Sequence, residues 1–125
     1  VGVRDLAEIA LSLALEAVVA AGSPMLPFVV LEDASGRRMT RFDGDPVAAI
    51  DHARAYAEGS GADRAAVCWD GWLTVGGVRQ DAVVVQASDR RRSGVVVAHR
   101  YRETLEGVVV VGKPVLVGPG DPVVL

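Results

Sequence analysis

The segment from Arg64 to Arg102 constrains the fold most, because its apolar runs are separated by turn residues. Gly76-Gly77 stands between the runs Arg64–Val75 and Val78–Ser88. A pair of glycines between two apolar runs is typical of a two-residue hairpin turn, since glycine readily adopts the positive φ angles that such a turn requires. Residues 89–94 then connect to a third run, Val95–Arg102. We therefore predict three consecutive antiparallel strands.

Two other segments have the periodicity of helices. In Val3–Ala21 apolar residues recur at helical spacing on more than one side, and Gly22-Ser23-Pro24 ends the pattern. Asp45 and Pro46 are favourable residues for the N-cap and the first turn of a second helix. The apolar pattern that follows them predicts a helix to about Glu58.

Shorter apolar segments complete the predicted sheet. Phe28–Leu31 and Arg38–Phe42 flank a group of turn residues and predict a hairpin between the two helices. Val108–Val111 and Val115–Val117 predict two last strands, joined by a turn at Gly112-Lys113-Pro114. The predicted element order is α-β-β-α-β-β-β-β-β. We interpret this as an α+β fold in which both helices pack on one face of a mostly antiparallel sheet.

Composition limits the class of protein. The chain has 125 residues, of which 50% are hydrophobic and 23% charged, as expected for a single folded domain over residues 1–125. A net charge of -3 gives no overall attraction to nucleic acid or to an anionic membrane. Cys68 is the only cysteine, which excludes a disulfide framework and a multi-cysteine zinc site. The apolar run 9–21 is too short to span a membrane. We expect a cytoplasmic protein with no membrane segment and no cofactor.

The two-residue turn fixes a strand register. It places Cys68 opposite Val85, Asp70 opposite Val83, Trp72 opposite Asp81 and Thr74 opposite Arg79. If the 89–94 connection continues this pattern, Val83 lies opposite Arg100 and Asp81 opposite Arg102. One face then carries mainly apolar and aromatic side chains, which we expect the helices to cover: Val67, Trp69, Leu73, Val84, Val97, His99 and Tyr101. The second face is apolar at one end and charged at the other.

The charged end of the second face is the candidate ligand site. It contains Asp70, Arg79, Asp81, Arg100 and Arg102. Carboxylates among guanidinium groups could hold an anionic ligand or position a metal ion. The same side chains could instead form cross-strand ion pairs that fix the register. We identify no catalytic residue, because neither His52 nor His99 has a convincing partner and Cys68 lacks basic neighbours.

Three valine-rich runs, 83–85, 95–97 and 108–111, predict strands that are covered on both faces. Two helices on one face leave the other face for the last strands or for a second copy of the chain. Trp72, beside Asp81 and Arg102, is the predicted interface anchor, and the alternative is a rim residue that covers the sheet. We therefore expect a homodimeric interaction or regulatory module rather than an enzyme. The alternative is a ligand-binding or hydrolytic domain that uses the Asp/Arg cluster. A third hypothesis is a module that binds a different protein.

Overall fold

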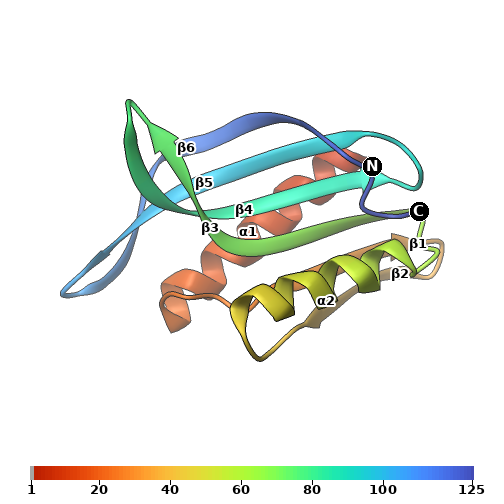
Figure 1. The fold of residues 1–125 in the computed structure, drawn as a ribbon, viewed down its shortest axis with the longest axis horizontal. Coiled ribbons are helices and arrows are strands. Elements are labelled where there is room, and N and C mark those ends of the chain that lie inside the picture. Colours follow the sequence, from red (N-terminus) through yellow and green to blue (C-terminus); the bar gives the residue numbers. More distant parts are fainter. Residues whose placement is uncertain (1) are drawn as a thin grey trace.

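The computed structural model describes residues 2–125, which form two helices and a six-stranded antiparallel sheet (Figure 1). The elements in chain order are α1 (Val3–Ala21), β1 (Phe28–Asp33), β2 (Gly36–Arg41), α2 (Pro46–Glu58), β3 (Arg64–Val75), β4 (Val78–Asp89), β5 (Gly94–Thr104) and β6 (Gly107–Gly120). The strand order across the sheet is β2-β1-β3-β4-β5-β6. The predicted α+β class is confirmed.

The last strand, β6, joins the two strands that were predicted at the end of the chain. Val115 pairs with Ala98 and Val111 pairs with Arg100, so residues 112–114 of β6 lie opposite His99 alone. The predicted turn at Gly112-Lys113-Pro114 is therefore a bulge within one strand, a position that tolerates proline. The segments of β6 before and after this bulge correspond to the two predicted last strands. With these segments counted separately, the predicted element order is confirmed.

The two helices cover opposite faces of the sheet. Buried residues of α1 pack in one cluster with Phe28 and Cys68, whereas Ala53 of α2 packs in a second cluster with Val29 and Val67. Adjacent residues of a strand point to opposite faces, so α1 and α2 cannot share one. Figure 1 shows α1 behind the sheet and α2 in front of it. The prediction that both helices pack on one face is wrong, because β1 and β3 are apolar on both faces and each face is covered by its own helix.

Local sequence signals explain how α2 begins and packs. The carboxylate of Asp45 accepts a hydrogen bond from the Ala48 amide at 3.1 Å, and Pro46 occupies the first turn, as predicted. The side chains that α2 buries are all alanines, at positions 49, 53 and 57. These short side chains allow a close approach to β1 and β3. Val123 and Val124 complete this cluster, and the Ser88 hydroxyl accepts a hydrogen bond from the Val123 amide at 2.9 Å.

The register between β3 and β4 is as predicted, but the register between β4 and β5 differs by one residue. Val83 pairs with His99 rather than with Arg100, and Val85 pairs with Val97 rather than with Ala98. The connection between β4 and β5 is centred on Arg91, which has a φ of 62°. It therefore contains an odd number of residues, whereas the predicted register assumed an even number. A shift of one residue exchanges the faces of a strand. His99 and Tyr101 consequently lie on the α1 side of the sheet, and Arg100 lies on the α2 side.

A network of charges around the buried carboxylate of Glu32 links four strands at the end of β1. Glu32 accepts hydrogen bonds from Nη1 of Arg64 and from Nε of Arg37, each at 2.6 Å. Nε of Arg64 also donates to Asp89 at 3.0 Å. The hydrogen bond from Arg64 lowers the pKa of Glu32, and Arg37 adds to this effect, against the raising effect of burial. Strands β1, β2, β3 and β4 are thus linked by one network of charges.

Glu32→Gln is expected to destabilise the protein at neutral pH but not in acid. Because the folded-state pKa of Glu32 lies below its ordinary value of 4.5, its ionised form stabilises the fold above that value. This contribution is lost as the pH falls through the folded-state pKa, where wild-type Glu32 also becomes neutral. Urea unfolding of both proteins across the acid range should show a difference in unfolding free energy that shrinks with falling pH. A difference independent of pH would contradict this role of the Glu32 charge.

Candidate functional site

The five residues of the predicted ligand site do not form one cluster. Asp70, Arg79 and Asp81 lie on the α1 side of the sheet, whereas Arg100 and Arg102 lie on the α2 side. The single Asp/Arg cluster was predicted wrongly, because the β4–β5 register differs by one residue from the predicted register. Nη1 of Arg100 donates instead to the side-chain oxygen of Gln80 at 3.1 Å. Ligand binding by either group stays a prediction.

Asp70 is the centre of a hydrogen-bond network that the sequence analysis missed. Its Oδ1 accepts from the Tyr101 hydroxyl at 2.6 Å, and its Oδ2 accepts from the Met25 amide at 2.8 Å and from the Ser23 hydroxyl at 3.0 Å. Burial, and then the hydrogen bond to Asp70, raise the pKa of Tyr101, so the phenol keeps its proton. The network attaches the segment after α1 to β3 and β5. It was missed because the predicted register placed Tyr101 and Asp70 on opposite faces.

The two tryptophans lie on opposite faces, as predicted. Trp72 is 54% exposed, and the guanidinium of Arg79 lies over its ring, 3.8 Å from the ring centroid. The guanidinium of Arg54, from α2, lies 4.7 Å from the ring centroid of Trp69 on the other face. Both contacts are cation–π pairs. A role of Trp72 in an interface stays a prediction.

The remaining candidates for chemistry are two histidines and one cysteine. His52 is exposed on α2, whereas His99 is buried on the α1 side of β5. Cys68 is fully buried, and burial raises the pKa of its thiol, which disfavours the reactive thiolate. Within residues 2–125 no group of three His, Cys, Asp or Glu side chains is placed to hold a metal ion.

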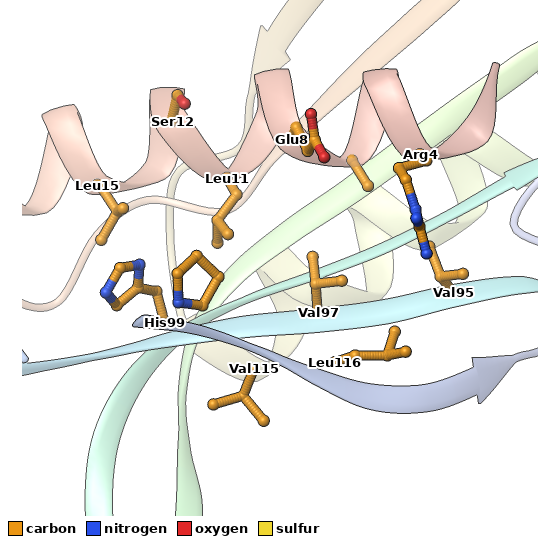
Figure 2. Close-up of a pocket in the computed structure, with 12 residues that line it drawn as sticks. Arg4, Glu8, Leu11, Ser12, Leu15, Val95, Val97, His99, Val115 and Leu116 are labelled. Atoms are coloured by element: carbon orange, nitrogen blue, oxygen red, sulfur yellow. The ribbon is translucent and has the colours of Figure 1, made fainter. Parts of the chain in front are cut away.

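A groove runs between α1 and the β5–β6 edge of the sheet (Figure 2). Its volume is about 460 Å³, within the usual range for small-molecule sites. Apolar side chains of Leu11 and Leu15 form its helix wall, and Val97 and Leu116 form its sheet wall. His99 lies at one end of the groove, and Arg4 lies at the other. The sequence could not reveal this groove, because it depends on where α1 crosses β5 and on the bulge in β6.

The α2 side of β4, β5 and β6 carries no helix, because α2 packs on β1 and β3 (Figure 1). We call this surface the open half of the sheet. Strand alternation and the observed registers place its apolar residues, which are Val84, Val96, Val109, Val111 and Val115, and Leu73 of β3 lies at its border. Val115 also lines the groove, and Figure 2 shows its side chain on the far side of β6 from α1.

The chain matches no protein-family model, and comparisons with curated proteins and with solved structures found no match. Neither α1 nor α2 combines the length and the apolar character that a membrane-spanning helix requires.

Proposed function

We propose that this protein is an interaction module that self-associates through the open half of its sheet, with no catalytic role of its own. The observation that carries the proposal is a sheet surface lined by apolar residues and covered by no helix. Val109 in this surface is 46% exposed. Burial of such side chains against a second copy removes apolar area from water and favours association. We place the module in the cytoplasm, which accords with a single unpaired cysteine.

Packing of two open halves face to face is the mode of association that we propose. The alternative is pairing of two β6 edges into one continuous sheet, which needs a regular edge with free amides. The bulge at residues 112–114 interrupts the β6 edge, and Pro114 and Pro119 have no amide hydrogen to donate. A face-to-face contact between identical sheets has two-fold symmetry and closes after two copies.

Two arginines of the open half bond to neutral side chains within the chain. Arg54 and Arg100 border this surface, and each donates to a neutral amide, Gln86 at 3.1 Å and Gln80 at 3.1 Å. Arg54 also stacks on Trp69. The guanidinium of Arg54 thus has partners within the chain, whereas Nε of Arg100 is buried with no hydrogen-bond partner among residues 2–125.

The neighbours Val109 and Val110 offer a matched test of self-association. They point to opposite faces of β6 and are 46% and 38% exposed. Val109→Lys is expected to weaken the dimer at least about tenfold, because it buries an unpaired charge in the interface. Val110→Lys adds the same charge outside the open half and should leave the dimer unchanged. Light scattering coupled to size-exclusion chromatography, over a series of concentrations, measures both.

The results for these variants distinguish three possible interfaces: the open half, the β6 edge and the end of the β3–β4 hairpin. A wild-type protein that is monomeric at all concentrations would overturn the proposal. Equal weakening by Val109→Lys and Val110→Lys would point to the β6 edge instead of the open half. Trp72 was predicted to anchor the interface, but it lies on the α1 side of the sheet, outside the open half. Trp72→Ala should therefore leave a dimer formed by the open halves unchanged. Loss of the dimer in Trp72→Ala alone would move the interface to the end of the β3–β4 hairpin.

A further inference from the structure

The strands that form the open half carry arginine on that face but no carboxylate. Strand alternation and the observed registers place Arg100 and Arg102 of β5 on the α2 side. The acidic residues of β4 and β5 are Asp81, Asp89 and Glu103, and all three alternate to the α1 side. A second copy packed face to face on the open half therefore brings positive charge toward positive charge, which opposes association.

Arg100 is held within this surface and cannot turn away into solvent. It lies on β5, the middle strand of the open half, and its Nη1 donates to the side-chain oxygen of Gln80 at 3.1 Å. Its Nε is buried, so the guanidinium lies along the sheet. Gly112 of β6 leaves room for it, because a Cβ at that position would lie 2.9 Å from Nη2 of Arg100. Arg102 is exposed and can remain hydrated at the rim of an interface.

Nη2 of Arg100 is the donor that remains for a partner outside the chain. It makes no hydrogen bond within residues 2–125 and, unlike Nε, it is not a buried atom. In the same part of the chain no carboxylate lies within ion-pair distance of Arg100, since the ion pairs are formed by Arg37, Arg38 and Arg64. A guanidinium enclosed in an interface without a counter-charge is unfavourable. The open half thus lacks an anion opposite Arg100.

We propose that a small oxyanion joins the two copies, an inference that rests on the proposed self-association through the open half. In a two-fold contact centred on β5, the Arg100 side chain of each copy approaches that of the other. A phosphate or a dicarboxylate between them accepts from Nη2 of both copies, since guanidinium groups bind either anion through charge-assisted hydrogen bonds. The anion cancels the repulsion between the copies. The supply of such an anion then regulates the dimer.

The test measures the dissociation constant of the dimer in sodium chloride, sodium phosphate and sodium malonate at about pH 8, where the last two anions are mainly divalent. Equal ionic strength in the three salts keeps general screening the same. Phosphate or malonate is expected to tighten the dimer at least about tenfold relative to chloride. An effect of phosphate alone would identify a phosphate group as the ligand, and an effect of malonate alone would identify a dicarboxylate. The same dissociation constant in all three salts would overturn the inference.

Two variants locate the anion. Arg100→Gln removes the charge and keeps an amide donor, so it is expected to dimerise in chloride about as tightly as the wild type does in phosphate, with no further effect of the anion. Arg79→Gln removes an exposed arginine from the α1 side and should respond to phosphate as the wild type does. An equal loss of the phosphate effect in both variants would overturn the assignment to Arg100. If Arg100→Gln fails to fold, the comparison of salts on the wild type decides alone.

The same data separate this inference from the proposed function. A dimer that forms equally well in every salt would overturn the bridging anion and leave self-association through the open half intact. A wild type and an Arg100→Gln variant that are both monomeric in every salt would overturn self-association itself.

Discussion

Asp70→Ala is expected to lower the free energy of unfolding by about 3 kcal/mol. The substitution removes the acceptor of three hydrogen bonds, which come from Tyr101, Ser23 and the Met25 amide. All three are partly buried, so the donors cannot fully replace Asp70 by water. The attachment of the α1–β1 connection to β3 and β5 would weaken as a consequence.

Chemical denaturation of Asp70→Ala and of two comparison variants measures this effect. Asp81→Ala removes an exposed carboxylate from the same face and should change the unfolding free energy by less than about 0.5 kcal/mol. Tyr101→Phe removes one of the three donors and should cost about 1 kcal/mol. Equal stability of Asp70→Ala and Asp81→Ala would show that the network contributes nothing to the fold.

Gly94→Ala is expected to destabilise the protein by at least about 3 kcal/mol. A Cβ at this position would overlap the carbonyl group of Ala87 and would lie 2.8 Å from Cα of Ser88. Both atoms belong to the backbone of β4, so no side-chain rotation relieves the overlap. The start of β5 would have to move away from β4, which would disturb the pairing of Val95 with Ala87.

Gly59→Ala is the control for the loss of glycine itself. Its Cβ would meet only the Ala55 carbonyl oxygen at 3.6 Å, an ordinary contact, and its φ of -90° suits any residue. The Gly59 variant should be as stable as the wild type or slightly more stable, because alanine restricts the unfolded chain. Thermal unfolding monitored by circular dichroism compares the two variants. Similar midpoints would contradict the clash at position 94.

Local signals in the sequence were sufficient to predict the elements of the fold. The Asp45-Pro46 pair marked the start of α2, and Gly76-Gly77 set the β3–β4 register correctly. The β4–β5 register depended on the backbone of Arg91, a non-glycine residue with positive φ, and composition does not reveal such a conformation. One residue of error there was enough to separate Asp70 from Tyr101 in the prediction.

Features that depend on tertiary packing could not be predicted. The placement of the helices on opposite faces follows from β1, where Val29 and Val30 are both buried, and a short apolar run does not tell one covered face from two. The groove requires the axis of α1 to be known relative to β5. It has no signature in the order of residues.

The burial of Val123 and Val124 against α2 affects the order in which the protein folds. These residues share a cluster with Val29 and Ala53, which lie some 70 to 95 positions earlier in the chain. Contacts of such long sequence separation slow folding, because a large loop must close before they stabilise the chain. During synthesis the α2 side of the core therefore remains incomplete until residues 123 and 124 have left the ribosome, whereas α1 and the first hairpin are available much earlier.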